Sequence, residues 1–123
     1  MRVLLVDDEE MVREIMAETL EDAGFAVLAA ASGPEALALL AAGQSVDALV
    51  TDLSMPGMDG IALIGAVHER WPDLPAVLLT GHAGHSAALA TDGTFSLLRK
   101  PVSATQLTDH LRTLLAARAR TGG

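Results

Sequence analysis

The segment ALVTDLSMPGMDG, residues 48–60, joins a strand pattern to a loop pattern. Its first residues are apolar at every position, as in a strand of a parallel sheet that is covered on both faces. The run reaches an acid at Asp52, and Pro56, Gly57 and Gly60 then interrupt it. The segment therefore predicts a buried strand, and it raises the question of what a carboxylate does at the end of that strand.

Similar apolar runs recur along the chain and alternate with helical stripes. The strands are expected near residues 2–6, 26–30, 47–51, 76–80 and 96–100. Such alternation implies right-handed crossovers and a parallel sheet with helices on both faces. Units of this length favour the flavodoxin-like strand order 2-1-3-4-5 over a closed barrel. We therefore predict an α/β fold of three layers around a doubly wound, five-stranded parallel sheet.

Capping residues mark the starts of two helices, and apolar spacing marks a third. Ser32 with Glu35, and Ser103 with Gln106, have the spacing of capping boxes. A further helix is expected over residues 61–70, ending before a proline.

The remaining two helical segments differ in the strength of their patterns. The segment at residues 84–93 offers only Leu89 as a large apolar anchor, so we expect a short or irregular fourth helix. The first helix has a clear apolar stripe, which is expected to face inward. Its members are Val12, Ile15, Met16, Thr19, Leu20 and Ala23.

Composition limits the chain to one domain and excludes several classes of protein. The 123 residues, half of them apolar, can enclose one core, which we place at residues 1–119, with a flexible tail at 120–123. The chain has no apolar run of about 18 residues and no basic leader, so we expect a cytoplasmic protein without a membrane segment. It has no cysteine, which removes disulfides and thiolate metal sites. The net charge of −8 argues against binding of nucleic acid by this chain alone.

Polar side chains follow the ends of several predicted strands. Asp7 and Asp8 follow the first strand, and Asp52 ends the third, which is its expected neighbour. Ligands of open parallel sheets bind at this carboxyl-terminal edge. Clustered carboxylates repel one another unless a cation or a proton is shared, and Mg²⁺ prefers oxygen ligands. Thr80 and Lys100, at the ends of the last two strands, add a hydroxyl and an ammonium group, so the edge has what binding of a phosphoryl group requires.

Four motifs in this order resemble the receiver domains of two-component response regulators. They are VLLVDDEE (3–10), ALVTDLSMPGMDG (48–60), AVLLTG (76–81) and LLRKPV (97–102). The resemblance covers nearly the whole chain. It implies that Asp52 is the phosphorylated aspartate, that Asp8 binds Mg²⁺ directly and Asp7 partly through water, and that the backbone carbonyl of Ser54 completes the protein ligands.

The resemblance also implies a signalling switch that is not an enzyme in its own right. A histidine kinase or a histidine phosphotransfer protein would donate the phosphoryl group, Thr80 and Lys100 would hold it, and slow self-catalysed hydrolysis would remove it. A downstream protein would read the surface of the fourth helix, fifth strand and fifth helix. Many receivers have an aromatic residue at the position of Leu97, so an aromatic switch is not expected. The last motif and the arginine-containing tail resemble the C-terminal receivers of hybrid histidine kinases.

Several other interpretations remain open from the residues alone. A phosphatase of the haloacid dehalogenase type also uses carboxylates, Mg²⁺, a hydroxyl and a lysine, but Ser54 stands where that family has its second aspartate. A pseudo-receiver would only bind partners. The acids after the first strand are also favourable at a helix start. His82 and His85 are a conceivable metal pair, but the segment lacks a clear third ligand, and we interpret them as loop histidines.

Overall fold

The computed structural model of the chain describes residues 1–81, 96–100 and 103–121, and for residues 117–121 it describes the backbone alone. Its five strands form one parallel sheet in the order β2-β1-β3-β4-β5, which confirms the predicted flavodoxin-like topology. The strands are β1 (Arg2–Val6), β2 (Ala26–Ala30), β3 (Ala48–Asp52), β4 (Ala76–Thr80) and β5 (Ser96–Arg99).

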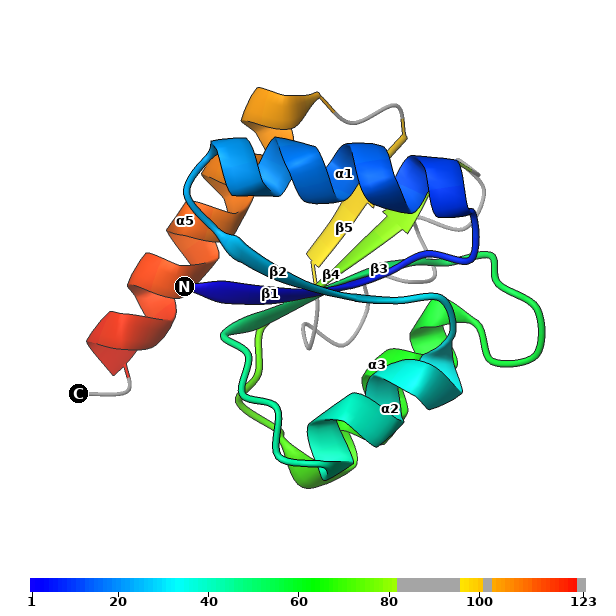
Figure 1. Cartoon of the computed structure of the whole chain (residues 1–123). Coiled ribbons are helices and arrows are strands. Elements are labelled where there is room, and N and C mark those ends of the chain that lie inside the picture. Colours follow the sequence, from blue (N-terminus) through cyan, green and yellow to red (C-terminus); the bar gives the residue numbers. More distant parts are fainter. Residues whose placement is uncertain (82–95, 101–102, 122–123) are drawn as a thin grey trace.

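Helices cover both faces of this sheet, as Figure 1 shows. The helices α1 (Glu10–Asp22) and α5 (Ala104–Thr121) lie on one face. The helices α2 (Gly33–Ala41) and α3 (Gly60–Arg70) lie on the other. None of these helices is long and apolar enough to cross a membrane.

The sheet separates the buried side chains into two cores. Successive residues of a strand point to opposite faces, so each central strand contributes to both. In β3, Leu49 packs in the core under α2 and α3, and Val50 packs in the core under α1 and α5. All five residues of β3 and of β4 are buried, which explains why these runs are apolar at nearly every position.

Side-chain caps fix the starts of α2, α3 and α5. The hydroxyl of Ser32 accepts a hydrogen bond from the Glu35 amide (3.2 Å), and that of Ser103 accepts one from the Gln106 amide (3.0 Å). Asp59 caps α3 by accepting from the amide of Ala62 at 2.8 Å. The predicted capping serines are thus confirmed, and the aspartate cap of α3 is an additional one.

Three regions differ from the sequence-based expectations or lie outside the described residues. Ile15 was expected to face inward, but its side chain is 57% exposed because it borders a groove between α1 and α5. The helix α5 extends to Thr121, and the division into a domain at residues 1–119 and a flexible tail at 120–123 stays a prediction. The predicted short fourth helix at residues 84–93 and the histidines at 82 and 85 lie outside the described part of the chain.

Candidate functional site

Three carboxylates meet at the carboxyl-terminal edge of the sheet. Asp7 and Asp8 follow β1, and Asp52 ends β3, which pairs with β1 through Val6 and Thr51. One oxygen atom from each carboxylate lies within 4.8 Å of the oxygens of the other two. The structure therefore brings together the three acids that the sequence placed at neighbouring strand ends.

Asp7 is the most buried of the three acids, with 2% of its surface exposed. Burial raises the pKa of its carboxyl group, and the negative charges of Asp52 and Asp8 raise it further, whereas the Glu9 amide and the Lys100 ammonium lower it. Its Oδ1 atom accepts a hydrogen bond from the Glu9 amide at 2.9 Å. Its Oδ2 atom is buried and has no hydrogen-bond partner in the described part of the chain.

This set of oxygens fits a hard divalent cation. Three carboxylates at one point need a compensating positive charge, and the unpartnered Oδ2 atom of Asp7 needs a donor or an ion. Mg²⁺ takes carboxylate, carbonyl and water oxygens, which are the groups found at this edge.

Lys100 supplies a positive charge next to Asp52. Its Nζ atom lies 2.7 Å from Oδ1 of Asp52, and the side chains of Lys100 and Asp52 are 35% and 11% exposed. The backbone amide of Lys100 donates to the carbonyl of Thr80 at 2.7 Å. Thr80 is the last residue of β4 and is 1% exposed. The structure thus places the predicted threonine and lysine at the same edge as the acids.

The loop between β3 and α3, residues 53–59, carries Ser54, which is exposed. Gly57 has a φ of +79°, a conformation that glycine adopts without the steric cost of a side chain. Gly60 lies so close to β3 that an added Cβ atom would overlap the backbone oxygen of Asp52. Its amide donates to the carbonyl of Leu53 at 2.9 Å. The start of α3 is therefore packed directly against the end of β3.

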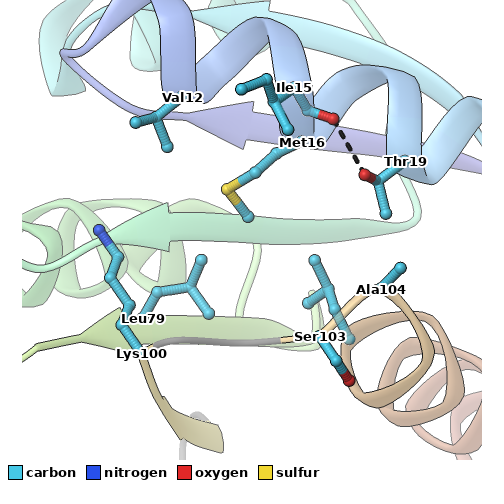
Figure 2. Close-up of a pocket in the computed structure, with 9 residues that line it drawn as sticks. Val12, Ile15, Met16, Thr19, Leu79, Lys100, Ser103 and Ala104 are labelled. Carbon is cyan, nitrogen blue, oxygen red and sulfur yellow. Dashed lines mark hydrogen bonds between the residues drawn. The ribbon is translucent and has the colours of Figure 1, made fainter.

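An apolar groove adjoins the acidic edge and encloses a cavity of about 460 Å³ between α1 and α5. Figure 2 shows the α1 side chains on one side of the cavity and Leu79 and Lys100 on the other. Lys100 thus borders both the groove and the acidic cluster. We call this feature the α1/α5 groove, and its lining includes Val12, Ile15, Met16, Leu79, Lys100, Ala104 and Leu107.

Sequence analysis did not identify this groove or Arg13. The Nη1 atom of Arg13 donates to the backbone carbonyl of Asp7 at 2.8 Å and so holds the turn that carries the acids. The available signal was that Arg13 is the one basic residue of α1. The groove had no such signal, because Ile15 belongs to the same apolar stripe as residues that are buried against the sheet.

Comparisons with known proteins agree with this geometry. The family model of the response regulator receiver domain matches residues 3–112. The C4-dicarboxylate transport transcriptional regulatory protein DctD of Rhizobium meliloti is 41% identical over 112 residues, which cover 89% of this chain and 24% of DctD. This chain thus spans about a quarter of that relative.

Solved structures show the same likeness. A response regulator receiver domain protein from Clostridium thermocellum has a TM-score of 0.90 at 28% identity, covering 98% of both chains. The response regulator TrrA of Thermotoga maritima, solved in complex with Mg²⁺ and BeF, has a TM-score of 0.83 at 28% identity, covering 92% of this chain and 97% of that one. The chain therefore belongs to the family of response regulator receiver domains, the phosphoacceptor domains of two-component signalling.

Proposed function

We propose that this domain accepts a phosphoryl group on Asp52 from a phosphohistidine of a histidine kinase or a histidine phosphotransfer protein, with Mg²⁺. The observation that carries this proposal is that Asp52 lies close to both a lysine and two further acids. Lys100 contacts its carboxylate at 2.7 Å, and Asp7 and Asp8 each have a carboxylate oxygen within 4.8 Å of an oxygen of Asp52. A carboxylate in these surroundings can act as a nucleophile toward a phosphoryl group whose negative charge would be offset by Lys100 and by a cation held among the acids.

In the transfer step, an oxygen of Asp52 forms a bond to phosphorus while the bond between phosphorus and the imidazole nitrogen of the donor breaks. The electron pair of that bond leaves with the imidazole. Lys100, which pairs with Asp52 before the reaction, is placed to follow the negative charge onto a phosphoryl oxygen. Thr80, at the same edge, would orient another phosphoryl oxygen through its hydroxyl group.

Three carboxylates and a backbone carbonyl are the proposed metal ligands. Asp8 and Asp52 would bind Mg²⁺ directly, Asp7 would bind partly through water, and Ser54 would contribute its backbone oxygen. When bound, the ion supplies positive charge that offsets both the acidic cluster and the incoming phosphoryl group. The aspartyl phosphate would then be lost by hydrolysis without a separate enzyme, so we class the domain as a self-catalysing switch.

The α1/α5 groove supports a docking position for the phosphodonor. Met11 and Ile15 on α1 are 73% and 57% exposed, and the groove extends from Ile15 to Lys100 at the phosphorylation site. We propose that an apolar helix face of the phosphodonor, next to its phosphohistidine, packs here. Exposed apolar side chains that continue into a reaction site are typical of such interfaces.

The output face is proposed to include β5, α5 and the segment that follows β4. Leu97 of β5 is half-buried and packs against the core of α2 and α3. It would therefore respond to a movement of Thr80 by repacking. The preceding segment, residues 82–95, lies outside the described residues, so its response stays a prediction from the sequence. A cytoplasmic location also stays a prediction.

Phosphorylation with acetyl phosphate tests the role of Asp52. The wild-type protein should incorporate one acid-labile phosphoryl group in the presence of Mg²⁺, and the Asp52→Asn variant should incorporate none while keeping its circular dichroism spectrum. Asp73→Asn is a matched control, because Asp73 is an exposed acid that precedes β4 at the other end of the sheet. Equal labelling of Asp52→Asn and wild type would refute the proposal.

A further inference from the structure

We propose that the contact between Met58 and Gly33 positions the loop that supplies the Ser54 carbonyl, so that this pair sets the affinity of the site for Mg²⁺. The inference rests on the proposed function, because it concerns the metal ligands named there. Met58 belongs to the loop of residues 53–59, and Gly33 is the first residue of α2. The two residues are 25 positions apart in the sequence, and neither is a metal ligand.

The contact is close and depends on the missing side chain of Gly33. A Cβ atom built at Gly33 would lie 2.6 Å from Sδ, 3.0 Å from Cγ and 3.2 Å from Cβ of Met58. Carbon and sulfur atoms do not approach to such distances without a shift. The side chain of Met58 therefore occupies the space that any other residue at position 33 would fill, and Gly33 is buried beneath it.

The helix that carries Gly33 is a fixed support. Ser32 caps its first turn by accepting from the Glu35 amide, and the Glu35 carboxylate accepts from the amide of Ala31 at 3.0 Å. Ala36 and Leu40 anchor the helix in the core with 0% and 6% of their surfaces exposed. A side chain that packs on this helix start is therefore held in one place.

The loop itself has few other attachments. Its first residue, Leu53, is fixed by backbone hydrogen bonds to Leu79 and Gly60, both of 2.9 Å. Residues 54–58 make no hydrogen bond within the described part of the chain. Their position therefore depends on packing, and the side chains that provide it are those of Met55 and Met58, which pack against the core of α2 and α3.

These observations give Met58 a positioning role. Ser54 lies between the fixed Leu53 and the packed methionines, so the direction of its carbonyl group follows from where the methionines rest. Figure 1 shows this loop extending from the end of β3 past the start of α2 before it enters α3. A substitution that displaces Met58 should thus change the metal site although it changes none of its ligands. Residues behind metal ligands commonly act on affinity in this indirect way.

Titration with Mg²⁺, followed by the amide resonances of residues 52–55, 57 and 58, tests this role. We expect Gly33→Ala to weaken Mg²⁺ binding by about threefold or more, which is below the cost of removing a direct partner of a ligand. We expect Met58→Ala to weaken it as well, because the loop then loses its contact with α2. The double variant Gly33→Ala with Met58→Ala should bind more tightly than either single variant, since the new methyl group fills part of the vacated space.

Two controls separate this inference from other effects. Leu40→Ala, near the other end of the same helix and seven residues from Gly33, should lower the melting temperature and leave the Mg²⁺ affinity unchanged. Failure of the wild-type protein to bind Mg²⁺, or equal binding by Asp8→Ala, would refute the proposed function. If the wild-type protein binds Mg²⁺ and Asp8→Ala does not, two results would overturn the positioning role. One is an unchanged Mg²⁺ affinity in Gly33→Ala and Met58→Ala, and the other is a loss of affinity in the double variant that equals the sum of the two single losses. If Gly33→Ala does not fold, unchanged affinity in Met58→Ala alone overturns it.

Discussion

Replacement of Gly60 by alanine is expected to destabilise the protein strongly, although glycine is normally the poorer helix residue. The added Cβ atom would overlap the backbone oxygen of Asp52 and would lie 2.6 Å from Cδ1 of Leu78. The leucine end can rotate away, but the Asp52 oxygen belongs to a central strand that is paired on both sides. The start of α3 must therefore move away from β3.

The size of the effect follows from what this movement breaks. Forcing an extra carbon into a packed contact costs about 1–3 kcal/mol. The hydrogen bond from the Gly60 amide to Leu53, at 2.9 Å, is lost as the helix start moves, which costs about 0.5–1.5 kcal/mol more. We expect a total loss of about 2–4 kcal/mol, which corresponds to a fall in melting temperature of about 8–15 °C for a domain of this size.

Gly65 provides the matched control, five residues further along the same helix. A Cβ atom there meets nothing within 4 Å, and its φ is not positive. Gly65→Ala should therefore stabilise the protein by about 0.5–1 kcal/mol through helix propensity alone. Thermal unfolding followed by circular dichroism measures both variants. The reasoning would be wrong if Gly60→Ala melted within about 2 °C of wild type, or if both variants fell equally.

Three further outcomes are expected. Burial raises the pKa of Asp7 above its ordinary 3.8, so this group stabilises the folded state below pH 3.8, and that stabilisation is lost as the pH rises through the folded-state pKa. Asp7→Asn should therefore have a higher melting temperature than metal-free wild type at pH 7. An equally large increase in melting temperature at pH 3 would contradict this. Asp59→Ala should cost about 1 kcal/mol through loss of the α3 cap, measured by urea unfolding beside the exposed control Asp73→Ala, and equal costs would refute the cap. Mg²⁺ at about 100 times its dissociation constant should stabilise the wild-type protein by about 2.7 kcal/mol, measured by calorimetry. A chelator should reverse this stabilisation, and Asp8→Ala should largely lack it. Stabilisation that persists in the presence of the chelator would contradict the metal site.

The sequence predicted the sheet and the acidic residues at its carboxyl-terminal edge closely, because both depend on short stretches of the chain. Runs such as Val3–Val6 and Ala76–Leu79 are apolar at every position because both faces of the sheet are covered. Strand order then follows from the rules of connection, and strand order brings Asp7 and Asp52 to neighbouring strand ends. The proximity of the acids could therefore be predicted without any knowledge of side-chain packing.

Features that depend on packing between distant elements could not be predicted in this way. The periodicity that buries Leu20 also includes Ile15, and only the separation of α1 from α5 at that end leaves Ile15 exposed. The contact of Met58 with Gly33 joins a loop to the start of α2, and the two segments have no shared pattern in the sequence. Likewise, Glu35 matches a capping box, yet its carboxylate bonds to Ala31, one residue before the cap. Each of these features depends on which side chains come into contact in the folded protein, and the spacing of residues in the sequence does not determine that.

The strand β3, which ends in Asp52, contributes side chains to both hydrophobic cores of the domain. Leu49 packs under α2 and α3, and Val50 packs under α1 and α5. The position of β3 between the two helix layers therefore depends on the packing on both faces of the sheet. A larger side chain in either core would displace β3 and change the contact between Asp52 and Lys100. Core substitutions in this domain should therefore be tested for phosphorylation as well as for stability, since tighter packing on one face of the sheet would displace Asp52, the proposed phosphoacceptor.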